Sequence, residues 1–305
     1  MEHSRLNTAV LAIITCLLWS SAFAGIKVGL QYTSPVQFAG IRFFISGLLV
    51  FPLAWRNNPG FFRIVARNLK MILLISFLQT FLQYLLFYTG INMIPGAVAA
   101  IVIGSQPLFI AFVAHFLMPG DRLTLLKTTI IFFGIAGVVL VSLGKDQESV
   151  TGKIAGAGIL ILVGVNILSG LSNILVASEK GMIPPLVLSS TSLILGGASL
   201  FLFSIPLEGL QFGAKPAPYY LSLGWLSMLS AVAISIWITL LKRPGIKVSE
   251  LNLWKFLIPL SGAILSWIIL PAEKPEALSI AGMVIIALSL IILNTINKKL
   301  PNFIL

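Results

Sequence analysis

The chain has 305 residues, of which 58% are hydrophobic and 10% are charged, and its mean hydropathy is +1.03. An ordinary soluble domain carries about 25% charged residues, so this composition excludes soluble enzymes, disordered regulators and secreted disulfide-rich modules. A net charge of +11 suggests nucleic-acid binding in a soluble chain, but its meaning here depends on where the charges lie relative to the apolar segments.

Ten apolar segments are long enough to cross a bilayer as α-helices. In chain order they run over 8–30, 35–55, 69–90, 96–118, 123–143, 153–177, 182–206, 217–241, 249–270 and 278–297. The sequence therefore predicts an all-α polytopic membrane protein with ten transmembrane helices. A competing interpretation places a signal-peptidase site at Ala22-Phe23-Ala24, which would leave nine spans, but the apolar pattern continues to Leu30.

The positions of lysine and arginine predict the orientation. With a cytoplasmic N-terminus, 14 basic residues, Lys127 and Lys255 among them, are counted on the cytoplasmic side and 4 outside, while Lys27 and Arg42 fall within spans. Cytoplasmic connections carry an excess of Lys and Arg, so we expect an inner-membrane protein with both termini in the cytoplasm and no nucleic-acid partner. The segment 61–67 is expected to lie along the inner interface as a short amphipathic stretch.

An internal repeat relates the two halves of the chain. The matching pairs, separated by 150, 152 and 152 positions, are Pro35 and Pro185, Pro107 and Pro259, and Asp121 and Glu273. We therefore expect a first repeat over 1–145 and a second over 152–298, each with five helices. Because five is odd, the second repeat must enter the membrane from the opposite side, which gives the inverted arrangement found in many secondary transporters.

Short motifs follow one another in a defined order along the chain. They are Leu18–Phe23 with Ile26-Lys27, Pro35 to Arg42-Phe43, Ala97 to Pro107, Gly120–Thr124, Gly134–Val138, Pro259, Glu273 and Gly282–Ile285. Their order and spacing, over nearly the whole chain, resemble the EamA family of the drug/metabolite transporter superfamily. The resemblance implies two EamA repeats, cytoplasmic termini and transport of small metabolites, often outward. Asp121 departs from the family pattern, which commonly has Glu after the fourth span.

Ionisable side chains inside a membrane are rare and point to functional sites. Within the predicted spans we identify Lys27, Arg42 and His115. Lys27 and Arg42 are candidates for binding an anionic group such as a carboxylate. The alternative is that Lys27 extends to the outer interface while Arg42 caps carbonyl groups of a neighbouring helix. For His115 we expect a structural hydrogen bond.

Neutral polar and aromatic side chains that share helix faces are further candidates for solute contacts. They are Ser20, Phe23, Gln79, Gln83, Gln106, Asn166, Asn173, Ser230, Trp237 and Asn252. Hydrogen bonding between helices is the alternative role for these side chains. Pro107 and Pro259 interrupt the backbone hydrogen bonds of their helices, so we predict hinges there.

These features predict a secondary transporter that exports amino acids or related zwitterionic or anionic solutes by alternating access. Glu250, the second residue of the segment 249–270, is at the end of its predicted span, and no carboxylate lies deeper within any of them. This favours a uniporter or an exchanger over an ion-driven pump. The alternative is a channel or a non-transporting membrane scaffold. We expect no enzyme activity, cofactor or metal site, because nucleophile and metal-ligand motifs are absent and Cys16 is the single cysteine. A monomer in the lipid bilayer, binding a small-molecule substrate, is the simplest expectation.

Overall fold

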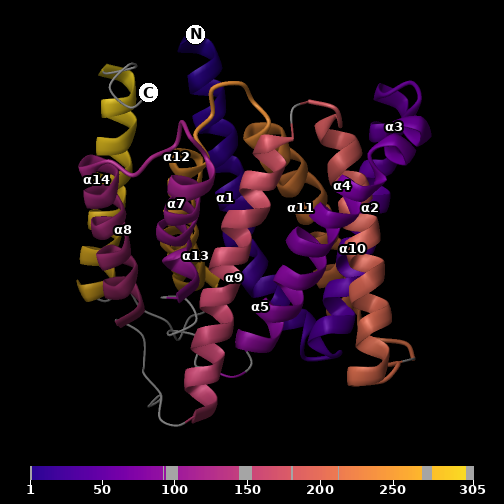
Figure 1. Ribbon diagram of the computed structural model, residues 1–305. Helices are drawn as coiled ribbons and strands as arrows, with labels where there is room; N and C mark the ends of the chain where they lie inside the picture. The colour runs from indigo at the N-terminus through magenta and orange to yellow at the C-terminus, as the bar shows by residue number, and fades with distance from the viewer. Residues whose placement is uncertain are drawn as a thin grey trace. The chain divides into compact units, whose positions relative to one another are not determined.

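A computed structural model describes residues 2–91, 93, 102–143, 153–179, 181–211, 213–269 and 277–299. Within these ranges all regular secondary structure is helical (Figure 1), which confirms the all-α class. Five helical stretches are long and apolar enough to cross a membrane, over 35–57, 69–91, 156–178, 185–208 and 217–241. Shorter apolar helices lie within four further predicted spans. The chain is therefore a multi-pass helical protein, whereas the count of ten spans stays a prediction.

The helices begin and end close to the predicted segments. Their bounds are α1 Glu2–Gly29, α2 Pro35–Asn57, α3 Phe61–Arg67, α4 Leu69–Ile75, a π-helical stretch η1 Ser76–Leu82, α5 Gln83–Ile91, α7 Gln106–Leu117, α8 Leu125–Leu143, α9 Lys153–Ser178, α10 Pro185–Glu208, α11 Ala217–Leu241, α12 Val248–Leu253, a 3₁₀ turn η2 Trp254–Phe256, α13 Leu257–Ile269 and α14 Ala277–Lys299. The third and ninth predicted spans are thus interrupted by irregular helix. Such interruptions often occur at functional positions.

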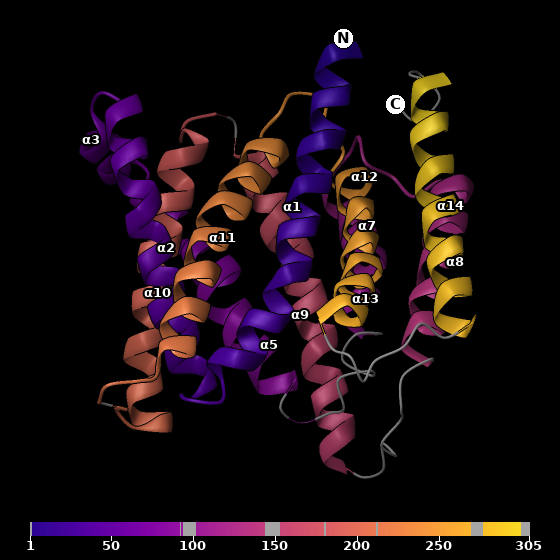
Figure 2. The same ribbon diagram turned by 180° about the vertical axis from the view of Figure 1, so that it is seen from behind.

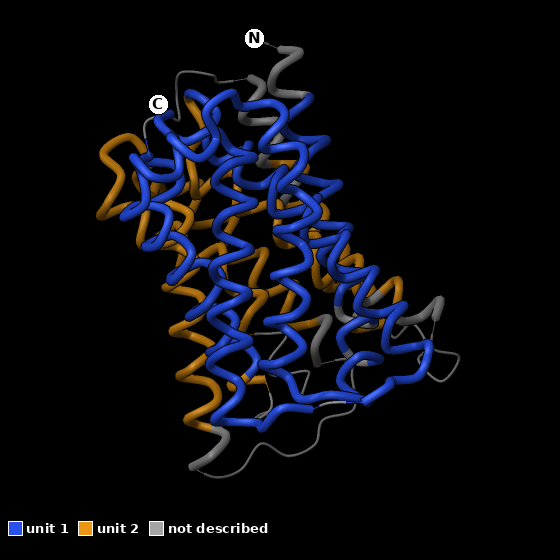
Figure 3. Tube along the Cα trace, turned by 90° about the vertical axis from the view of Figure 1, so that its right-hand side faces the viewer, with its two compact units in different colours: residues 1–88, 175–244 blue, residues 89–174, 245–305 orange. Residues whose placement is uncertain are grey.

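The chain forms two compact units, each built from two separate stretches (Figure 3). Unit 1 contains Met1–Tyr88 and Leu175–Pro244, and unit 2 contains Thr89–Ile174 and Gly245–Leu305. Each unit therefore combines elements from both halves of the sequence. The predicted repeats at 1–145 and 152–298 describe sequence relationships and stay a prediction.

In unit 1, α2 and α10 lie side by side along much of their length (Figures 1 and 2). Glycines make this close approach possible, because a Cβ at Gly40 would lie 2.5 Å from the backbone nitrogen of Phe201. A Cβ at Gly197 would lie 2.3 Å from the backbone nitrogen of Phe44. Small residues allow helices to pack tightly where the surrounding lipid is as apolar as the side chains.

The starts of α2 and α10 are marked by the proline pair found in the sequence. Pro35 and Pro185 are each the first residue of their helix, where the missing N–H group costs no hydrogen bond. The N-terminus of α2 is also bound by the carboxylate of Glu208, which accepts the N–H groups of Val36 and Gln37 at 2.9 and 2.8 Å. A negative charge at this position complements the helix dipole.

Unit 2 has its own core around α8, α12, η2 and α14. α8 and α14 lie side by side (Figures 1 and 2), and Ile131, Val138 and Ile286 are buried with Phe256 in one cluster. A Cβ at Gly137 would lie 2.6 Å from the side chain of Ile286, so glycine again permits close packing. α7 packs against α12 in the same unit.

The predicted hinge prolines lie near interruptions in their helices. Pro107 is the second residue of α7, directly after a turn at Ser105, and Pro259 is the third residue of α13, after the 3₁₀ turn. The interruptions fit the expected loss of backbone hydrogen bonds. Movement about them stays a prediction.

Candidate functional site

The most unusual side chain of unit 1 is Arg42, two turns into α2. It is 3% exposed, and its Nε and Nη2 groups donate to the Ser230 hydroxyl oxygen on α11 at 3.0 and 2.8 Å. Its guanidinium lies 4.8 Å from the centre of the Phe43 ring, a cation–π distance. Two residues proposed from separate helices, Arg42 and Ser230, are therefore in direct contact.

Aromatic side chains from α5 complete the surroundings of Arg42. The Phe43 ring packs on that of Tyr84, with 4.2 Å between ring centres. The hydroxyl groups of Tyr84 and Tyr88 are near enough to interact electrostatically with the guanidinium. These tyrosines were missed by the sequence analysis, although their four-residue spacing on one face of the third span was visible.

No carboxylate balances the charge of Arg42 among the described residues. The acidic side chains of unit 1 that the structure describes have other partners, since Glu208 binds the start of α2 and Glu179 pairs with Lys242 after α11. Burial lowers the pKa of Lys242 to about 8. Burying a charge without a compensating partner costs several kcal/mol, so the position of Arg42 needs an explanation beyond packing.

The other predicted residues of unit 1 show mixed environments. Ser20 donates to the carbonyl of Leu17 within α1, and Trp237, 2% exposed, packs edge-to-face on Trp19 at 5.0 Å. The side-chain oxygen of Gln79 is buried without a hydrogen-bond partner among the described residues.

Three further predicted residues, Phe23, Lys27 and Gln83, belong to unit 1. Gln83 begins α5. The side chains of Phe23 and Lys27 lie outside the described residues, so the suggested pairing of Lys27 with Arg42 stays a prediction.

Four predicted residues gather in unit 2 and form hydrogen bonds between helices. Asn173 on α9 donates to Asn252 on α12 at 2.9 Å. Asn166 donates to the carbonyl of Val102 at 2.6 Å. These bonds follow the alternative interpretation, in which the amides connect helices.

Gln106 accepts a hydrogen bond from Lys255 at 2.7 Å. From the sequence, Lys255 is counted among the cytoplasmic charges. Lys255 lies in η2, within the ninth predicted span, and not in a connection between helices, while the side of the membrane on which it lies stays a prediction.

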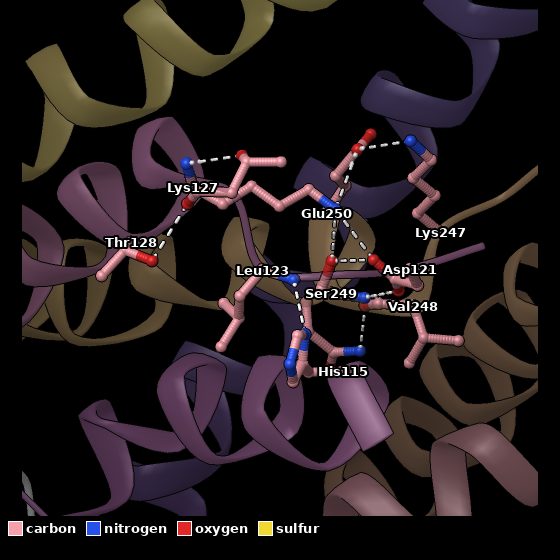
Figure 4. Close-up of polar contacts among 11 residues, drawn as sticks. His115, Asp121, Leu123, Lys127, Thr128, Lys247, Val248, Ser249 and Glu250 are labelled. Atoms are coloured by element: carbon pink, nitrogen blue, oxygen red, sulfur yellow. Dashed lines mark hydrogen bonds and ion pairs between the residues drawn. The ribbon is translucent and has the colours of Figure 1, made fainter. Parts of the chain in front are cut away.

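An ion-pair cluster in unit 2 joins the connection after α7 to the start of α12 (Figure 4). Lys127 Nζ lies 2.8 Å from Asp121 and 3.4 Å from Glu250, and both Lys127 and Asp121 are 2% exposed. Asp121 also accepts the backbone N–H of Ser249 at 2.7 Å. Lys127, likewise counted as a cytoplasmic charge, is therefore a buried residue of α8 whose charge is compensated.

The edge of this cluster contains two further groups. Burial lowers the pKa of Lys247 below its ordinary value. The negative charge of Glu250, whose carboxylate lies 3.8 Å away, offsets part of this shift. His115 accepts the backbone N–H of Leu123 at 3.1 Å (Figure 4), the structural hydrogen bond expected for it. No group of three or more potential metal ligands occurs among the described residues.

Comparisons with known proteins found one family model and several similar transporters. The model of the EamA-like transporter family matches residues 6–143. The uncharacterized transporter YvbV of Bacillus subtilis (strain 168) is 26% identical over 300 residues, which cover 96% of this chain and 93% of that protein. A probable amino-acid metabolite efflux pump of Escherichia coli (strain K12) is 26% identical over 304 residues, covering 93% of each.

The fold also has a solved counterpart. One crystal structure matches with a TM-score of 0.79 and 16% sequence identity. The match covers 96% of this chain and 98% of the chain in that structure. At this identity the likeness concerns the fold alone.

Proposed function

We propose that the chain, whose residues 6–143 match the model of the EamA-like transporter family, is a transporter of this kind and exports amino acids or related zwitterionic and anionic solutes. A relative of nearly the same length is named a probable amino-acid metabolite efflux pump, which supports both the direction and the solute class.

Arg42 is the observation that carries the solute class. A buried guanidinium without a carboxylate partner is suited to bind the carboxylate of a solute, because its planar array of N–H groups matches two carboxylate oxygens. The hydroxyl of Ser230 keeps the guanidinium in place when the site is empty. Gln79 offers a buried acceptor in the same unit, which suits an ammonium group.

Alternating access between two inverted repeats is the proposed mechanism. Within the units, α2 packs on α10, α7 on α12 and α8 on α14. These helices correspond to the second, fourth and fifth predicted spans, and each one contacts the span that follows five places later in the chain. A pseudo-two-fold axis that exchanges the halves would produce this pattern of partners. The proposed topology has ten spans in an inner membrane, with both termini in the cytoplasm.

We propose uniport or exchange rather than ion-driven transport. The carboxylates of Asp121, Glu179 and Glu208 are each bound by a lysine or by backbone N–H groups, and so are already engaged. Solute movement would then depend on the solute gradient itself.

Counterflow in proteoliposomes, without an imposed ion gradient, tests this function. The solutes tested are labelled amino acids, each paired with its carboxamide, which has nearly the same shape but lacks the carboxylate. We expect saturable exchange of amino acids and little exchange of the carboxamides. Equal exchange of both would contradict the carboxylate site, and absence of saturable exchange across the panel would contradict the proposed function.

A further inference from the structure

The short helix α3 lies in the connection between α2 and α4, in unit 1 (Figure 1). The corresponding connection of the second half joins α10 to α11 over 209–216, and its described residues, 209–211 and 213–216, form no helix. A fold of two repeated halves therefore does not require α3. Its presence needs a separate reason.

The position of α3 is defined by aromatic packing against the end of α2. Phe61 is 4% exposed, and its ring meets that of Phe51 edge-to-face, with 5.3 Å between ring centres. Gly60, the residue directly before α3, has a φ of 85°, a conformation that favours glycine. Asn68 closes the helix, donating its side-chain amide to the carbonyl of Ile64 at 2.9 Å. Unlike a mobile loop, this helix therefore presents its outer face in one orientation.

The outer face of α3 and its flanks are basic. We define the α3 surface as the exposed side chains of Trp55, Arg56, Phe62, Arg63, Arg67, Leu69 and Lys70. None of its four basic side chains forms an ion pair with a described residue. The sequence also has no Asp or Glu between Glu2 and Asp121, so nothing nearby in the chain neutralises these charges.

Large apolar side chains lie among the charges of the α3 surface. Phe62 is 65% exposed, Trp55 58% and Leu69 45%, although other apolar side chains of the same segment, such as Phe61, are buried. Basic residues combined with exposed aromatic residues are typical of segments at a membrane surface, where the rings enter the headgroup region.

We propose that the α3 surface binds the headgroups of anionic phospholipids. The four positive charges complement the lipid phosphates, and the exposed aromatic and leucine side chains contact the adjoining acyl chains. A free phosphate ester would satisfy the charges alone, so the apolar part of the surface favours a lipid as the occupant. This binding does not depend on which solute the protein transports.

Lipid titration of the purified full chain, followed by native mass spectrometry, tests the proposal. The probes are phosphatidylglycerol, phosphatidylcholine and glycerol 1-phosphate. A basic side chain near an anionic surface contributes about 1 kcal/mol, or roughly fivefold in affinity, so R63Q/R67Q should weaken phosphatidylglycerol binding by about 25-fold. Binding of phosphatidylcholine should change little.

The matched control is R122Q/K215Q, which removes two positive charges from connections elsewhere in the chain. We expect it to retain wild-type binding of phosphatidylglycerol. Equal loss in the two double variants would overturn the assignment to α3 and indicate a general charge effect. Binding of glycerol 1-phosphate as tight as that of the lipid would overturn the lipid as the occupant. Thermal unfolding of each variant verifies folding, and no transport assay enters the result.

Discussion

Arg42 and Lys127 are buried cations among the described residues, and their surroundings differ. In unit 2, Lys127 lies between Asp121 and Glu250 and contacts Ser249, so two carboxylates compensate its charge. In unit 1, Arg42 is buried to the same degree but contacts a hydroxyl group and aromatic rings. A compensated charge is part of a structural link, whereas a charge that lacks a counter-ion is suited to a ligand that supplies one.

This difference predicts opposite responses to substitution. Removing one partner of a compensated pair leaves the other charge buried and alone, which destabilises the fold strongly. Removing a charge that has no counter-ion relieves a desolvation cost, so stability is kept while binding is lost. Stability and transport measured on the same variants therefore separate the two roles.

The largest effect is expected for Asp121→Asn. The variant leaves Lys127 with one carboxylate instead of two and weakens the acceptor at the start of α12, so we expect a loss of about 3–5 kcal/mol in the free energy of unfolding. Chemical unfolding in detergent measures it. Combining the change with Lys127→Met should recover most of the loss, and wild-type stability of the single variant would show that the cluster is not a structural link.

Arg42→Gln should affect transport instead. A hydrogen bond to a charged group contributes about 1.5–3 kcal/mol, so we expect exchange of carboxylate-bearing solutes to fall about 10- to 100-fold, with no decrease in melting temperature. Counterflow and thermal unfolding are measured on one preparation, with Arg122→Gln, an exposed arginine, as the control. Normal exchange would remove Arg42 from the solute site, and a marked loss of stability would assign it a structural role.

Ser230→Ala sharpens the comparison by removing the group that orients Arg42 while retaining its charge. The hydrogen-bond acceptor contributes about 1 kcal/mol, so the KM for exchange should rise about fivefold with little change in maximal rate. Concentration-dependent counterflow distinguishes the two parameters. A fall in maximal rate at unchanged KM would show that Ser230 acts on a step other than binding.

Glu208→Gln should have the smallest effect. The carboxylate binds the N-terminus of α2, where a negative charge contributes about 0.3–1 kcal/mol, so a slight loss of stability with normal exchange is expected. Counterflow provides the critical reading. Exchange reduced as far as in Arg42→Gln would indicate that Glu208 also serves the solute site, which would weaken the contrast between the two units.

Several local features of the fold were predictable from the sequence. The helix starts at Pro35 and Pro185 follow from proline geometry, which acts on neighbouring residues alone. The segment 61–67 was recognised from its pattern of aromatic and basic residues, and α3 has the same bounds. Arg42 was identified because a charge in an apolar segment is unusual.

Only the tertiary structure identified the partners of these residues. The count of basic residues placed Lys127 and Lys255 with the cytoplasmic charges, although Lys127 is buried against Asp121 and Lys255 contacts Gln106. Likewise, nothing local indicates that the Ser230 hydroxyl reaches Arg42, 188 positions away. The sequence by itself determined the membrane class and the helices, because apolar length and helix termini are local properties. Which buried charge is compensated was decided by helix packing, since it brings together residues that are far apart in the chain.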